Sequence, residues 1–198
     1  MIKEYEPLQV APLKTGATFV RPVQHFPDSV KLSDPAISVM TDLNKVAVVN
    51  VRAKTSMNKA NAKMIRYGVR MLLVLDDSDQ VVGLLTASDV LGEKPMRFLQ
   101  NMGGTHEDIM VRDIMTTQRE LEVLKIADVE ASQIGQIVAT LKKTHRQHAL
   151  VVSEGADGRQ TVCGLFSITQ IARLLGAPAQ SFELATTFAE IEAVIARG

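Results

Sequence analysis

Side chains that could do chemistry lie in the second half of the chain, in a basic run from Lys142 to His148 and in an apolar segment holding Cys163. His145 and His148 have a spacing that suits a metal, but no third ligand is nearby, so we expect no metal site. Cys163 with His148 would give a nucleophile and a base, yet no oxyanion hole or orienting acid accompanies them. We therefore predict no catalytic residue and no enzyme, with Cys163 as a small hydrophobic residue.

Two helix starts carry hydroxyl groups followed by an acid or an amide: Thr86-Ala-Ser-Asp89 and Ser167-Ile-Thr-Gln170. Taken alone, a threonine at this place is a helix N-cap, and an acid in the first turn is favoured by the helix dipole. Gly83 and Gly164 precede these segments inside apolar runs. Glycine within a strand marks a close approach, and either a ligand or a neighbouring strand would be an adequate cause.

The elements that position these segments form a repeat. Each copy reads as strand, helix, two strands and helix, preceded by Met-Thr at 40–41 and 115–116. The predicted elements are a strand 46–51, a helix 56–67, a hairpin 72–75 with 81–85 and a short helix after Thr86; then a strand 121–126, a helix 132–144, a hairpin 149–152 with 161–166 and a helix 167–175. The strands are apolar on consecutive residues, which predicts burial on both faces under outer helices.

Composition excludes several classes of function. The 198 residues carry 22 basic and 22 acidic side chains, so the zero net charge gives no general attraction to nucleic acid or anionic lipid. Aromatic residues make up only 4%, and bases would find few stacking partners. No apolar run approaches the roughly 20 residues that span a bilayer, and no signal sequence is visible, so we expect a cytoplasmic protein with no nucleic acid or membrane partner.

The repeat resembles a tandem pair of CBS (cystathionine β-synthase) domains. The resemblance rests on Gly83-Leu-Leu-Thr-Ala-Ser-Asp89, on Gly68-Val-Arg-Met-Leu-Leu-Val74, on Lys54-Thr-Ser-Met57 and, in the second copy, on Gly164-Leu-Phe-Ser-Ile-Thr-Gln170. It implies an α/β fold of two β-α-β-β-α repeats in pseudo-twofold contact. It also implies a regulatory module that binds AMP, ADP, ATP or S-adenosylmethionine between the repeats, and a homodimer.

Carried over from the family, each cleft would take residues from both repeats. One cleft would use Leu84, Thr86, Ser88, Asp89, Lys125, Ile126 and Ser132, with Arg146 or His148 toward phosphate. The other would use Leu165, Ser167, Thr169 and Gln170 with Thr55 and Arg70. Asp89 would accept from the ribose hydroxyls. Gln170 stands where the family has Asp and lacks its charge, so we expect the second cleft to be weaker or empty.

The predicted organisation is an N-terminal extended arm 1–38 with a short strand at 18–20, repeats at 39–104 and 105–176, and a C-terminal amphipathic helix within 177–198. Pro35 predicts the start of a helix at 36–42. Phe182, Ala185, Phe188, Ile191 and Ile195 form an apolar stripe that packs on the module, across a dimer, or against a partner. No effector domain is visible, so a regulated protein would be a separate, unknown partner. The alternative function is a degenerate pair that serves only dimerisation or protein interaction, and Gln170 favours it.

Overall fold

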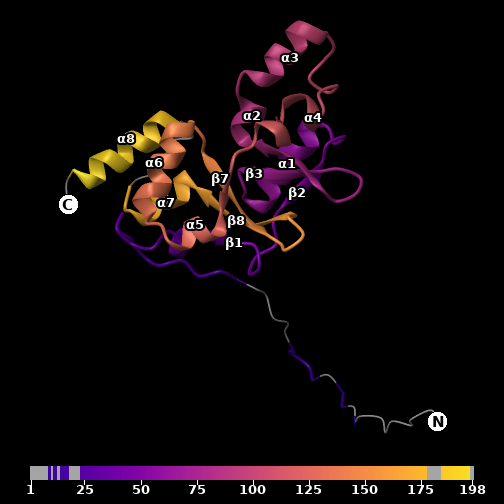
Figure 1. The fold of residues 1–198 in the computed structure, drawn as a ribbon. Helices are drawn as coiled ribbons and strands as arrows, with labels where there is room; N and C mark the ends of the chain where they lie inside the picture. The colour runs from indigo at the N-terminus through magenta and orange to yellow at the C-terminus, as the bar shows by residue number, and fades with distance from the viewer. Residues whose placement is uncertain (1–8, 10, 13, 18–22, 178–183, 197–198) are drawn as a thin grey trace.

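The protein forms two packed bodies, seen in a computed structural model that describes residues 9, 11–12, 14–17, 23–177 and 184–196 (Figure 1). Its two four-stranded sheets have the strand orders β2-β3-β4-β5 and β1-β8-β7-β6. We call the first sheet with its helices the first body and the second sheet with its helices the second body. The predicted α/β fold of two repeated units is confirmed.

The elements follow the repeat. The first body contains β2 (Asn50–Arg52), α1 (Met57–Tyr67), β3 (Met71–Leu75), β4 (Val81–Thr86), α2 (Ala87–Leu91), α3 (Lys94–Met102), α4 (Val111–Ile114), β5 (Thr116–Thr117) and η2 (Gln118–Glu120). The second body contains η1 (Ala36–Val39), β1 (Thr41–Asp42), β6 (Val123–Lys125), α5 (Ile126–Glu130), α6 (Ile134–Thr144), β7 (His148–Glu154), β8 (Gln160–Ser167), α7 (Ile168–Leu174) and α8 (Leu184–Ile195).

Strands buried on both faces explain the consecutive apolar residues in the sequence. On β3, Leu72 and Val74 pack with Met64 of α1 in the core of the first body. Leu73 points to the opposite face and packs with Leu150 of β7 at the junction between the bodies. Successive strand residues alternate between the two faces of a sheet. One face of each sheet therefore packs on its own helices, and the other face packs on the sheet of the other body.

Each body is completed by the segment that precedes the other repeat. Residues Thr41–Asp42 of β1 pair with β8, and Ala36 and Val39 of η1 are buried in the core of the second body. In the same way, β5 pairs with β4, and Val111 and Ile114 of α4 are buried in the core of the first body. The bodies therefore cross the sequence limits of the repeats, and the predicted limits 39–104 and 105–176 stay a prediction.

This crossing gives the reason for the two strand glycines. A Cβ atom on Gly83 would lie 2.6 Å from the backbone oxygen of Thr116 in β5. One on Gly164 would lie 2.4 Å from the sulfur of Met40, next to β1. Of the two causes left open by the sequence, the neighbouring strand segment accounts for both glycines.

The elements found differ from the prediction in several places. The predicted strand at 46–51 is found only as β2 at Asn50–Arg52. The chain before it forms a turn, in which the Val46 N–H donates to the Asp42 carbonyl at 3.1 Å, and it stays irregular as far as Val49. The predicted helix at 36–42 is the shorter η1, and Thr41–Asp42 join a strand instead. Helix α3 was not predicted, and it projects from the first body (Figure 1).

The C-terminal helix packs on the second body. Phe188 and Ile191 of α8 are buried in its core, and Glu192 forms an ion pair with Lys142 of α6. Phe182, the Ala185 side chain and the predicted strand at 18–20 lie outside the described residues. None of the described helices combines the length and the apolar character needed to cross a membrane.

Candidate binding cavity

A cavity of ≈ 380 Å³ lies between the bodies, where the linker before β2 and the start of β3 meet β7, β8 and α7. It is lined by Thr41, Leu43, Val46, Ala47, Val48, Val49, Gly68, Val69, Arg70, Met71, His148, Leu165, Ser167, Gln170 and Arg173. Both repeats contribute to this lining, as the resemblance implied. The volume lies within the range of roughly 300–1,000 Å³ that small-molecule sites occupy.

One side of the cavity is apolar. Leu43 and the segment Val46–Val49 form a wall of five side chains. These residues lie between β1 and β2 and belong to no helix or strand. The Val49 carbonyl accepts a hydrogen bond of 3.2 Å from Leu73 N–H, which anchors the end of this segment to β3. Leu165 of β8 continues the apolar surface from the second body.

The other side is cationic. Arg70 precedes β3, and its carbonyl accepts a hydrogen bond of 2.9 Å from Ala87 N–H, which ties its backbone to α2. Arg173 lies three residues after Gln170 on α7, and its Nη2 donates to Gln170 Oε1 at 3.4 Å. Burial lowers the pKa of Arg70, and the positive charge of Arg173 lowers it further. Among the described lining residues there is no Asp or Glu, so nothing acidic in the lining offsets these charges.

His148 opens β7 at the junction of the bodies and lines the cavity. Its side chain is buried, and its Nδ1 atom has no hydrogen-bond partner among the described residues. Burial lowers the pKa of His148 to about 4; the Arg70 charge lowers it as well, while the Asp89 charge opposes them. The imidazole is therefore neutral near pH 7.

Asp89 occupies the position in the first body that Gln170 occupies in the second, since both lie three residues after the last residue of the hairpin's second strand. Its carboxylate is satisfied by the protein itself. Asp89 Oδ2 accepts from Thr86 N–H and Thr86 Oγ1, both at 2.7 Å, and Oδ1 pairs with Lys94 Nζ at 2.7 Å. This is a capping box with an added ion pair, so the helix-capping interpretation of Thr86 and Asp89 accounts for all the contacts found.

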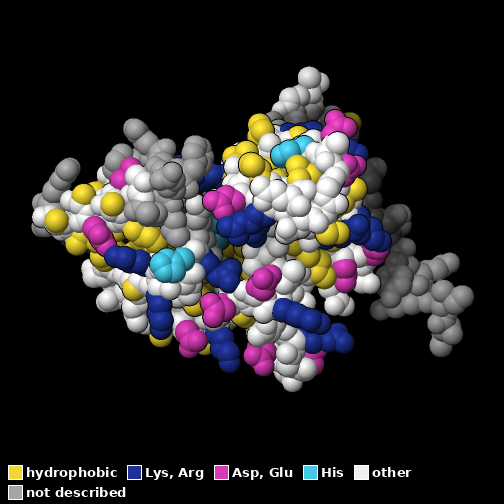
Figure 2. All heavy atoms as spheres, turned by 90° about the horizontal axis from the view of Figure 1, so that it is seen from above, with side chains coloured by type: hydrophobic (Ala, Val, Ile, Leu, Met, Phe, Trp, Pro, Cys, Tyr) yellow, Lys and Arg dark blue, Asp and Glu magenta, His cyan; other side chains and the backbone are white. Residues whose placement is uncertain are grey.

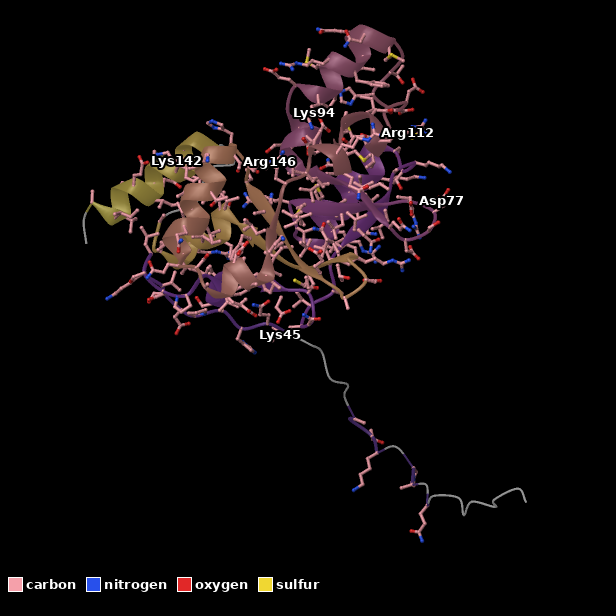
Figure 3. All side chains as sticks on the ribbon, viewed as in Figure 1. Lys45, Asp77, Lys94, Arg112, Lys142 and Arg146 are labelled. Carbon is pink, nitrogen blue, oxygen red and sulfur yellow. The ribbon has the colours of Figure 1, made fainter. Side chains whose placement is uncertain are left out.

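The space beside Asp89 is bridged by side chains of both bodies. Arg146 Nη2 donates to the Glu120 carbonyl at 2.6 Å, and Ser88 Oγ lies 3.3 Å from Gln147 Oε1. Figure 3 labels Lys94 on the first body and Arg146 on the second, both near the junction. Figure 2 shows Lys and Arg side chains between the two halves of the molecule, with Asp and Glu side chains beside them.

The structure thus divides the residues predicted from the sequence. Arg70, Ser167, Gln170, Leu165 and also His148, which had been assigned to the other cleft, line the cavity together. The remaining predicted residues Leu84, Thr86, Ser88, Asp89, Ser132, Arg146, Thr55, Thr169, Lys125 and Ile126 are not among its lining. Leu84 packs at the junction and Ser132 Oγ donates to the Asp128 carbonyl at 2.5 Å.

Two parts of the cavity were missed by the sequence interpretation. Arg173 was not considered, although residues three apart on a helix share a face and Gln170 was already a candidate. The segment Val46–Val49 was interpreted as a strand, since β-branched residues favour strands. No sequence signal separates a β-branched strand from a β-branched cavity wall.

The sequence profile of one family, the CBS domain, matches residues 36–95. No curated protein matches the chain. Solved structures do share its fold. An uncharacterized conserved protein from Pyrococcus horikoshii is 24% identical with a TM-score of 0.52, and the match covers 73% of this chain and 93% of that one.

Two further solved structures have a similar fold. CBSX2 of Arabidopsis thaliana, solved in complex with AMP, is 23% identical with a TM-score of 0.50, over 71% of this chain and 94% of that one. A conserved CBS domain protein from Thermoplasma acidophilum is 17% identical with a TM-score of 0.50, over 79% of this chain and 77% of that one. Residues 36–95 thus match the CBS domain, and the chain shares the fold of CBS-domain pair proteins.

Proposed function

We propose that this CBS-domain pair is a regulatory module that binds an adenine nucleotide in the cavity beside Gln170. One observation carries the proposal: a cavity of ≈ 380 Å³ has an apolar wall on one side and Arg70, Arg173 and His148 on the other, with no acidic residue in its described lining. That combination suits a flat apolar base joined to an anionic phosphate. The similarly folded CBSX2 has been solved with AMP, which supports the same ligand class.

In this proposal, the base packs against Leu43 and Val46–Val49, where apolar side chains exclude water. The amide of Gln170 and the hydroxyl of Ser167 bond the ribose hydroxyls. The two arginines bind the phosphate, because guanidinium groups offer paired donors that match phosphate oxygens. Burial and then the Arg173 charge lower the pKa of Arg70 in the protein alone, and phosphate binding relieves the repulsion between the two arginines.

The charge of the lining favours AMP, ADP or ATP over S-adenosylmethionine. The sulfonium group of S-adenosylmethionine is cationic, and two arginines repel it, while the described lining residues include no Asp or Glu to attract it. We propose the cavity at Gln170 and not the space beside Asp89, because the Asp89 carboxylate already binds Lys94 and Thr86.

Calorimetric titration of the protein with AMP, ADP, ATP and S-adenosylmethionine tests the proposal. We expect a phosphate-bearing nucleotide to bind at one site per chain, and Arg173→Gln to weaken it about tenfold. Arg159→Gln is the matched control, since Arg159 is an exposed arginine in the β7–β8 hairpin. If none of the four ligands binds, or if both variants bind like the wild type, the assignment to this cavity is wrong.

A second candidate function is dimerisation through the first body, with or without nucleotide. Ile65 of α1 and Leu91 of α2 are about three-quarters exposed, at 75% and 74%. The corresponding residues of the second body are Lys142, which pairs with Glu192 of α8, and the fully buried Ala172. Helix α8 thus covers on the second body a face that the first body leaves open, and we propose that a second copy covers it.

Analytical ultracentrifugation of Ile65→Lys tests this interface, with Val23→Lys as an exposed apolar control. A dimer for the wild type and the control, and a monomer for Ile65→Lys, is the expected result. Equal masses for all three proteins would exclude this face. As part of the proposed regulatory function, we also propose that the module acts on a separate effector protein and lies in the cytoplasm.

A further inference from the structure

His148 carries the strongest unexplained feature of the cavity. Its side chain is only 8% exposed, and its Nδ1 atom has no hydrogen-bond partner among the described residues. Buried polar atoms in proteins are nearly always paired, because an unpaired one loses its bonds to water without replacement. His148 lines the cavity and lies two positions before Leu150 on β7, so it shares the strand face that meets the first body. A cavity occupant could therefore supply its missing partner.

Charged groups surround His148 from three elements. Arg70 precedes β3 and Arg173 lies on α7, and both line the same cavity. Asp89 lies on α2, where Lys94 of α3 pairs with it at 2.7 Å. The linker segment Val46–Val49 faces the cavity without any titratable side chain. In the protein alone, burial and the Arg70 charge oppose a proton on His148, and the already paired Asp89 carboxylate favours it.

We propose that His148 gains a proton when an anionic nucleotide fills the cavity, so that binding takes up a proton from solution. The inference rests on the proposed function, because it needs a phosphate in the cavity. A phosphate brings one to two negative charges next to the arginines and offers oxygens that accept from both nitrogens of an imidazolium. The phosphate then offsets the positive charge of the arginines and accepts hydrogen bonds from the ring, and the imidazolium becomes the stable form.

The expected size follows from the two states. Burial and Arg70 hold the pKa of His148 at about 4 without ligand. An opposite charge within ~4–6 Å raises a pKa by roughly 1–3, so the bound protein should have a pKa of His148 near 6. Linkage then makes AMP binding about fourfold tighter at pH 5.5 than at pH 7.5, relative to a variant without the imidazole.

The first measurement is nuclear magnetic resonance of protein labelled at its histidines, titrated from pH 4 to pH 8 with and without saturating AMP. The His148 signal is assigned as the one lost in His148→Gln. We expect it to titrate near pH 4 in the free protein and near pH 6 in the complex. The exposed His106, changed to Gln, is the matched control and should leave this signal unchanged.

The second measurement is the AMP dissociation constant of the wild type and of His148→Gln at pH 5.5 and pH 7.5. The second ionisation of the AMP phosphate affects both proteins equally, so the ratio between them isolates His148. If AMP binds but His148 titrates alike in both states and the ratio stays constant, the proton uptake is refuted while the binding function stands. If AMP binds to neither protein at any pH, both the function and this inference are overturned.

Discussion

Replacing Gln170 by Asp restores a carboxylate at the position where Asp89 has one in the first body. The contacts of Asp89 indicate what that carboxylate would do. Asp89 bonds the first residue of its capping box and pairs with a lysine at 2.7 Å. In the second body the cation within reach is Arg173, whose Nη2 lies 3.4 Å from Gln170 Oε1. We therefore expect Gln170→Asp to pair with Arg173 and to offset its charge in the cavity.

The magnitude follows from Coulomb's law. At an effective dielectric constant near 20, a charge about 6 Å from the phosphate contributes roughly 2.8 kcal/mol. Arg173 is exposed and Gln170 only half-buried, so solvent and salt reduce this to about half. A loss of about 1.4 kcal/mol is a tenfold increase in the dissociation constant of AMP.

Calorimetry at one fixed salt concentration measures this change, and Gln170→Asn is the matched control because it has the length of Asp without the charge. We expect AMP to bind Gln170→Asp about tenfold more weakly than Gln170→Asn. Raising the salt concentration should bring the two variants closer together. Tighter binding by Gln170→Asp would mean that a ribose contact outweighs the lost arginine charge, and it would refute the electrostatic reasoning.

Three further predictions concern stability. Asp89→Asn should lower the unfolding free energy by about 1–2 kcal/mol, through loss of the Lys94 pair and a weaker cap, yet leave AMP affinity within about twofold; a tenfold loss of affinity would place the ligand at Asp89 instead. Gly83→Ala should destabilise by about 1–3 kcal/mol in denaturant titrations and Gly164→Ala by less, because the first clashes with a backbone oxygen and the second with a flexible methionine; the reverse order would contradict this. The pKa of His148 is about 4 in the folded protein against 6.5 unfolded, so the unfolded chain binds more protons between these values, and stability should fall by up to about 3 kcal/mol as the pH drops from 6.5 to 4. His148→Gln should lack this part of the pH dependence, and equal slopes would show that His148 is not buried.

The hairpins could be predicted because their physics is local. The strands at Met71–Leu75 and Val81–Thr86 are apolar on both faces, and a short turn of acidic and polar residues joins them. This pattern is typical of a hairpin whose strands are buried and whose turn is exposed. The crossing of β1 and β5 could not be predicted in the same way. Each strand has two residues, and their pairing depends on the close approach that Gly83 and Gly164 allow. The sequence indicated a close approach at each glycine, but it did not indicate whether a ligand or a neighbouring strand approaches.

The candidate site was harder to predict because one pattern has two physical causes. Threonine followed three residues later by aspartate satisfies the start of a helix, and it also matches a ligand-binding motif. In this protein the first cause accounts for the Asp89 contacts, and Lys94 from the unpredicted helix α3 takes the remaining oxygen. Gln170 cannot offset a cation, so Arg173 on the next turn keeps its charge in the cavity. The departure from the family pattern that argued for a weak site is, on this reasoning, what leaves the second cleft cationic and suited to a phosphate.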